Sequence, residues 1–174
     1  MTTFWSWLFK GSGNGAGLKR FLDRWILLHI AVGLALAFLT PIPLKDAAVT
    51  LLLPVAGIFI GLSFAWGGNA QALLQSTEIE NLSSFRDGGY VEYVYTFQAA
   101  ILMILVTLVL WAIAGLGVFD MVWPTCSNHY LYLVISFFLF FFSSLTVREC
   151  WHVVLGAQSM LLARFQIRKS SNER

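Results

Sequence analysis

Four long runs of residues without any Asp, Glu, Lys or Arg constrain the fold of this chain more than any other feature. Each run is close to or above the roughly 17–25 residues that a transmembrane helix needs. Only 11% of the 174 residues are charged, about half the share of an ordinary soluble domain. The sequence therefore predicts an all-α, polytopic membrane protein with four transmembrane helices. The four runs are Trp25 to Leu44, Ala47 to Trp66, Tyr93 to Phe119 and Tyr130 to Val147.

The fourth run continues into a more polar segment that keeps a helical pattern. No Gly or Pro interrupts the chain between Tyr130 and His152, and apolar residues recur at helical spacing from Val153 to Lys169. One helix of about 40 residues would be roughly 60 Å long, whereas the hydrocarbon core of a bilayer is about 30 Å thick. We therefore expect about half of this helix to project from the membrane.

Two connections between the runs carry clear turn signals. Pro41 and Pro43 are expected to end the first helix near Thr40, so that the first two runs form a hairpin. Between the second and third runs, residues 70–81 have helical character and the sequence from Asp87 to Gly89 signals a turn. We therefore expect helices 2, 3 and 4 all to extend into the cytoplasm.

The distribution of Lys and Arg predicts the orientation. Ten of these eleven residues lie on one side of the predicted membrane, and only Lys45 lies on the other. By the positive-inside rule both termini are cytoplasmic, in a multi-pass protein of the bacterial inner membrane. The predicted segments are a cytoplasmic or interfacial N-terminal segment (1–24), a first transmembrane hairpin (25–66), a cytoplasmic helical loop (67–92), a second transmembrane hairpin (93–147) and a cytoplasmic helical extension with a tail (148–174).

Two shorter sequence patterns concern packing. Phe4, Trp5 and Trp7 suit a short segment at the level of the lipid headgroups, and a disordered start is the alternative. Gly57 and Gly61 form a GxxxG pattern in the second run. We expect these two glycines to pack within the chain rather than to form a seam between two copies.

The sequence holds no motif that fixes a reaction, so no enzyme activity, catalytic residue, cofactor or metal ion is expected. Glu149 and His152 have the Glu-x-x-His spacing of di-iron bundles, but such a site needs further carboxylates from other helices. The pair instead fits a charged girdle where the fourth helix leaves the bilayer, with Trp151 at headgroup level. Cys126 and Cys150 are predicted on opposite sides of the membrane, which excludes a disulfide between them.

The polar residues inside the runs are few. His29 lies about one turn inside the first run, where we expect its side chain to reach the interface. No charged residue occurs at the centre of any run, which argues against a proton relay, a voltage sensor or a coupled transporter. The hydroxyl residues are expected to make helix-packing hydrogen bonds rather than to line a pore; they are Thr50, Ser63, Thr107, Ser136, Ser143, Ser144 and Thr146.

The projecting surface remains as the candidate for function, because an apolar helix outside the membrane needs a partner. Besides the lipid bilayer, the expected partners are other copies of the chain, in a homo-oligomer, and a soluble cytoplasmic protein. A net charge of +2 is too small to argue for direct nucleic acid binding. The residues expected to bind the partner are Glu78, Glu80, Arg86 and Asp87 in the loop, and Gln158, Leu161, Arg164, Phe165 and Arg168 after the fourth run.

The span pattern, the extension over residues 70–81 and the tail from Arg148 to Arg168 resemble the membrane subunit of the bacterial Kiwa antiphage defence system. This resemblance implies a four-helix protein that oligomerises and recruits a soluble, DNA-binding partner. Because the resemblance lies in topology, it assigns a role to no individual residue.

We therefore expect a non-enzymatic, oligomeric inner-membrane sensor or scaffold that recruits a cytoplasmic partner, with the defence role that the resemblance implies. One alternative is a pore-forming or membrane-disrupting effector with a conduit lined by Ser136, Ser143 and Thr146. Another alternative is an accessory subunit of a larger membrane complex.

Overall fold

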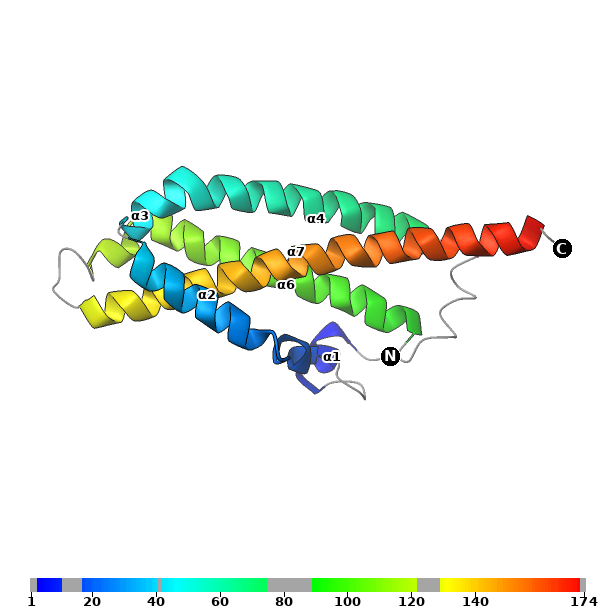
Figure 1. Cartoon of the computed structure of the whole chain (residues 1–174), viewed down its shortest axis with the longest axis horizontal. Coiled ribbons are helices and arrows are strands. Elements are labelled where there is room, and N and C mark those ends of the chain that lie inside the picture. Colours follow the sequence, from blue (N-terminus) through cyan, green and yellow to red (C-terminus); the bar gives the residue numbers. More distant parts are fainter. Residues whose placement is uncertain (1–2, 11–16, 41, 75–88, 122–128, 173–174) are drawn as a thin grey trace.

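The computed structural model describes residues 3–10, 17–40, 42–74, 89–121 and 129–172, and every regular element in these ranges is helical. Four helices are long, and Figure 1 shows them side by side with α7 running the length of the molecule. The long helices are α2 (Ile26–Leu39), α4 (Leu53–Leu74), α6 (Gly89–Gly115) and α7 (His129–Asn172). The short elements are α1 (Phe4–Lys10), η1 (Gly17–Phe21), α3 (Leu44–Ala47), the π-helical η2 (Ala48–Leu52) and η4 (Val118–Met121).

Helix α7 is the element on which the others pack. It is one continuous helix of 44 residues, and at 1.5 Å per residue it is about 66 Å long. Helices α2, α4 and α6 each contact it (Figure 1). The prediction of a single long helix from Tyr130 to Lys169 is therefore confirmed, and the helix is slightly longer at both ends.

Two of the described helices are long and apolar enough to cross a membrane, namely Val94–Gly115 within α6 and His129–Ser159 within α7. A third span results if the pair Ile26–Leu39 and Leu44–Thr50 is counted as one span, although the direction of the chain bends by 119° between its two helices. The structure thus supports two or three of the four predicted spans. Helix α4 covers much of the second predicted span and is not among these candidates.

The bend between α2 and α3 follows from the predicted proline turn. Helix α2 ends at Leu39, and Thr40 adopts an extended conformation with φ −87° and ψ 106°, as expected for a residue that precedes a proline. Pro43 is the N-cap residue of α3. The hydroxyl of Tyr132 on α7 accepts a hydrogen bond of 3.0 Å from the backbone N–H of Leu44, which satisfies one donor at the start of α3.

The interface between α6 and α7 combines an aromatic core with paired hydroxyls. Trp111 is buried, and its indole N–H donates a hydrogen bond of 2.7 Å to the Ser143 hydroxyl. One turn closer to the start of α6, the Thr146 hydroxyl donates a 2.8 Å bond to that of Thr107. Ser136 donates to the carbonyl of Tyr132 on its own helix. These hydroxyl groups therefore make hydrogen bonds within and between packed helices, as predicted.

The N-terminal aromatic residues pack on the beginning of α6. Trp7 and Leu8 of α1 form a small buried cluster with Phe21 and Ala99. The ring of Tyr95 lies 5.7 Å from the ring of Trp7, centroid to centroid. The alternative of a disordered start is thus wrong for residues 3–10, which form an ordered helix docked on the bundle.

The expected packing of the GxxxG glycines within the chain is also wrong. Gly57 and Gly61 are exposed on α4, and a Cβ atom built at either position meets nothing within 4 Å. The spacing places the two glycines on one face of the helix, but it does not determine whether that face packs on the bundle or is exposed.

Candidate functional site

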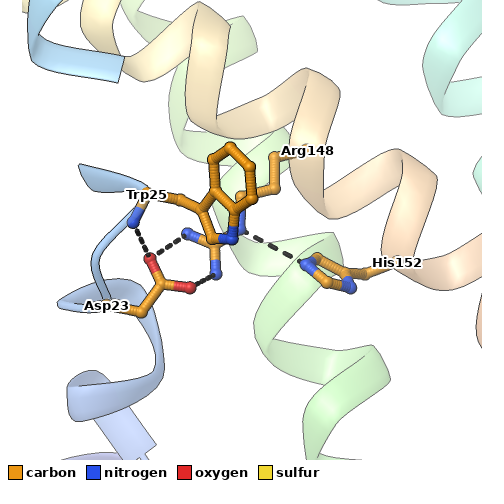
Figure 2. A network of polar contacts seen from close by, with 4 residues as sticks. All are labelled: Asp23, Trp25, Arg148 and His152. Atoms are coloured by element: carbon orange, nitrogen blue, oxygen red, sulfur yellow. Dashed lines mark hydrogen bonds and ion pairs between the residues drawn. The ribbon is translucent and has the colours of Figure 1, made fainter. Parts of the chain in front are cut away.

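A polar cluster joins the beginning of α2 to the middle of α7. Asp23 lies just before α2, and its carboxylate accepts two hydrogen bonds from the guanidinium of Arg148: 2.7 Å from Nη2 to Oδ2 and 3.2 Å from Nη1 to Oδ1. Figure 2 shows the two side chains facing each other in this bidentate arrangement. The backbone N–H of Trp25 also donates to Oδ1, at 3.0 Å. The carboxylate therefore holds both the first turn of α2 and the guanidinium of α7.

Arg148 also contacts His152, one turn further along α7. Its Nε–H donates a hydrogen bond of 3.3 Å to Nε2 of His152, so this ring nitrogen is the acceptor (Figure 2). The Arg148 side chain is 13% exposed and that of Asp23 is 36% exposed. The cluster therefore lies partly in the protein and partly at its surface, where water or a polar group outside the chain can reach it.

His29 lies one turn further along α2 and faces α7. Its Nδ1 lies 2.7 Å from the hydroxyl of Ser144, and the residue is only 7% exposed. The expectation that His29 reaches out to the interface is therefore wrong. Gly33 and Ala37 follow at helical spacing on the same buried face, so His29 belongs to the contact between the two helices.

Glu149 and His152 have different surroundings, although their spacing puts them on neighbouring parts of α7. Glu149 is 0% exposed, whereas His152 is exposed and bonded to Arg148. The interpretation of both residues as a charged girdle is thus wrong for Glu149, while the Trp151 side chain is exposed. Within the described parts of the chain, no group of three His, Cys, Asp or Glu residues could hold a metal ion.

An open groove of about 1250 Å³ begins at the polar cluster and runs beside α2 and α7 toward α3. Its walls are mostly apolar, with Leu28, Val32 and Leu36 from α2. Phe140 and Val147 of α7 are among the other lining residues. Thr40, Asp46 and Thr50 line its other end, so the groove has polar residues at both ends of a mostly apolar body.

The residues predicted to bind a partner are only partly described. Glu78, Glu80, Arg86 and Asp87 lie outside the described residues. Arg164 and Arg168 lie on α7, and only the backbone of these two residues is described. Gln158, Leu161 and Phe165 are exposed on α7, as a docking surface requires.

Sequence analysis did not find the pair of Asp23 and Arg148. A signal was present, because Asp23 stands two residues before the first uncharged run and Arg148 directly follows the fourth. Two opposite charges at the same level of a bundle are expected to pair, but only the packing of α2 on α7 makes these two neighbours.

In chemical terms, the cluster attaches α2 to α7 through a bidentate ion pair and sets a guanidinium beside an apolar groove. This arrangement suits binding and mechanical coupling of helices. No protein-family model, curated protein or solved structure matches the chain, so its function is inferred from these residues alone.

Proposed function

We propose that this chain is a non-enzymatic, homo-oligomeric scaffold or sensor of the bacterial inner membrane, with cytoplasmic termini, that recruits a soluble cytoplasmic protein. The exposed end of α7 is the observation that carries this proposal. The apolar stretch that could cross a membrane ends at Ser159, but α7 continues to Asn172. Leu161, Leu162 and Phe165 lie in this last part and are 44%, 65% and 70% exposed.

Exposed apolar side chains on a projecting helix are a common docking surface for another protein. Moving such a side chain from water to full burial is favourable by about 1.5–3 kcal/mol. A partner helix or groove that covers Leu161 and Phe165 would recover much of this free energy. Arg164 and Arg168 occupy the same part of α7 and would favour an acidic rim on the partner.

The packing of the bundle suggests how a membrane signal would reach this surface. Helices α2, α4 and α6 all contact α7, so a shift of any of them within the bilayer would act on the same long helix. We propose that a perturbation of the envelope changes the packing of α2 against α7, and that α7 transmits the change to the docked partner. A role in antiphage defence would follow from the resemblance in topology.

The homo-oligomer is supported by the outward face of α4. Gly57 and Gly61 are exposed, a Cβ atom built at either position meets no described atom within 4 Å, and GxxxG faces allow the backbones of two helices to approach closely. Helices from neighbouring copies could pack there.

A pore is the competing function, and the geometry of the hydroxyl groups does not favour it. Ser143 and Thr146 bond to residues of α6 in the same chain, and Ser136 bonds to its own helix. Vesicles reconstituted with the purified chain should therefore retain an entrapped dye. Rapid leakage would favour the pore over the scaffold.

The direct test is affinity purification of the full chain in mild detergent, compared with the double variant Leu161→Ser/Phe165→Ser. The variant should enter the membrane as the wild type does and lose the soluble partner. Leu116→Ser is the matched control, because Leu116 is 79% exposed at the other end of the bundle. Equal partner recovery from all three proteins would reject the proposed docking surface.

A further inference from the structure

Helix α2 has two adjacent faces with different roles. His29, Gly33 and Ala37 recur every four residues and are buried against the bundle. Leu28, Val32 and Leu36 recur with the same spacing, one residue earlier, and line the open groove. Because neighbouring positions on a helix are about 100° apart, the groove runs directly along the edge of the packed seam between α2 and α7.

The groove has the length of a lipid acyl chain. Its lining on α2 extends from Trp25 to Thr40, which corresponds to roughly 23 Å of helix. The groove is open along its length and holds about 1250 Å³, so an extended acyl chain can lie in it beside α2.

The end of the groove at the polar cluster has the features of a membrane interface. Arg148 and His152 line it, and the exposed indoles of Trp25 and Trp151 flank them. Tryptophan is the residue that marks headgroup level in membrane proteins. Asp23 lines the same end and is paired with Arg148, so the charge of the guanidinium is shared with this carboxylate.

We propose that this groove binds one membrane phospholipid, with an acyl chain along Leu28, Val32 and Leu36 and its phosphate at Arg148 and His152. The apolar body accepts methylene groups, each of which contributes about 0.8 kcal/mol on burial. The phosphate accepts hydrogen bonds at the polar cluster, where it shares the Arg148 guanidinium with Asp23. The site rests on the membrane location in the proposed function, but not on the recruitment of a partner. A bound lipid at this place would contact both helices of the seam that the polar cluster holds together.

The test uses the full chain in detergent, stripped of lipid and titrated with phosphatidylglycerol or with a diacylglycerol of the same acyl chains. Native mass spectrometry measures the bound lipid per chain. The wild type should bind one phosphatidylglycerol, and the diacylglycerol, which lacks a phosphate, should bind about fivefold more weakly.

Substitutions that fill the groove supply the second readout. Leu36→Trp and Thr50→Trp introduce a large side chain from two different walls and should weaken phosphatidylglycerol binding about tenfold. Leu34→Trp and Val49→Trp are the controls, because these exposed residues lie on the same elements but do not line the groove. Both controls should bind as the wild type does.

The outcomes separate this site from the scaffold function. If each groove variant binds phosphatidylglycerol as well as its control, the groove is not the lipid site. If the diacylglycerol binds as tightly as phosphatidylglycerol, the phosphate is not held at Arg148 and His152, and the proposal is overturned. The variant Leu161→Ser/Phe165→Ser should lose the soluble partner and keep the lipid, so failure of one function leaves the other measurable.

Discussion

Asp23 and Arg148 are 125 positions apart in the chain, yet their side chains meet in a bidentate pair. Such a pair is stronger and more directional than a single contact between two flexible charges, because the planar guanidinium and the carboxylate match in geometry. Removing the carboxylate would take this ion pair from the mostly buried guanidinium. This one contact therefore fixes the beginning of α2 on α7.

Asp23→Asn should destabilise the protein by about 1–2 kcal/mol, because the pair is only partly shielded from water. In a chain of this size the loss corresponds to a fall of about 2–8 °C in the midpoint of thermal unfolding. Circular dichroism in detergent measures this midpoint. Asp46→Asn, at an exposed carboxylate near the other end of α2, should leave it unchanged. Equal midpoints for the two variants would show that the ion pair contributes nothing to stability.

The sequence predicted which polar residues lie near the candidate site, but not the direction in which each side chain points. The sequence places His29, Arg148 and His152 near the ends of apolar runs, where polar residues are expected. It does not say that His29 turns inward to Ser144 or that Glu149 becomes fully buried. A side chain's direction is set by which face of its helix is packed, and these helices are apolar on all sides, so periodicity gives no preferred face.

Among the elements, α2 approaches α7 closely at Gly33. At Gly33, an added Cβ atom would lie 3.1 Å from Cβ and 3.2 Å from Cα of Phe141. The small residue thus permits the approach that brings His29 to Ser144 and Asp23 to Arg148.

Gly33→Val should force these two helices apart, at a cost of about 1–3 kcal/mol. Ala35→Val is the matched control, because Ala35 is exposed on the same helix, and its effect should stay within about 0.5 kcal/mol. Unfolding of the two variants in a detergent titration gives the difference. A Gly33→Val protein as stable as the control would mean that α2 can shift on α7 without cost.

The docking of α1 depends on a second glycine. Gly17 has φ +79°, in the left-handed region, and an added Cβ atom would lie 2.5 Å from the carbonyl oxygen of Leu8. Gly17→Ala should therefore weaken the docking of α1 by at least about 1–2 kcal/mol. Tryptic cleavage after the exposed Lys10 and Lys19 should become about 5–30 times faster, since it follows the population of the opened state. The control is Gly68→Ala, on an open surface of α4, and trypsin should cleave this variant at the wild-type rate.

The helices themselves were the most predictable part of this protein. An uninterrupted apolar run predicted α7 nearly to its ends, and two prolines predicted the end of α2, because both signals act through the local backbone. The π-helical η2 between α3 and α4 was not predicted. A π-helix depends on how neighbouring elements constrain a helix, and the residues from Ala48 to Leu52 have no local pattern that favours it.

At the scale of the whole molecule, α7 is a common support for three other helices and extends beyond them (Figure 1). The sequence predicted the length of this helix, but not that α2, α4 and α6 would all pack on it. That arrangement depends on contacts between distant segments, such as Trp111 with Ser143, which no local pattern encodes. The predicted loop helix over residues 70–81 continues α4 as far as Leu74, and the rest of it lies outside the described residues.

The proposed homo-oligomer gives the prediction that belongs to the whole assembly. Gly57→Leu/Gly61→Leu fills an exposed face of α4 where an added Cβ atom meets no described atom within 4 Å, so the single chain should fold and enter the membrane normally. Bulky side chains would hold neighbouring α4 helices apart, and the mass of the assembly in mild detergent should fall toward that of one chain. Gly67→Leu is the control, since a Cβ atom added at Gly67 also meets no described atom within 4 Å but lies roughly 100° around the helix. An unchanged mass of the double variant would show that the copies do not contact each other through this face of α4.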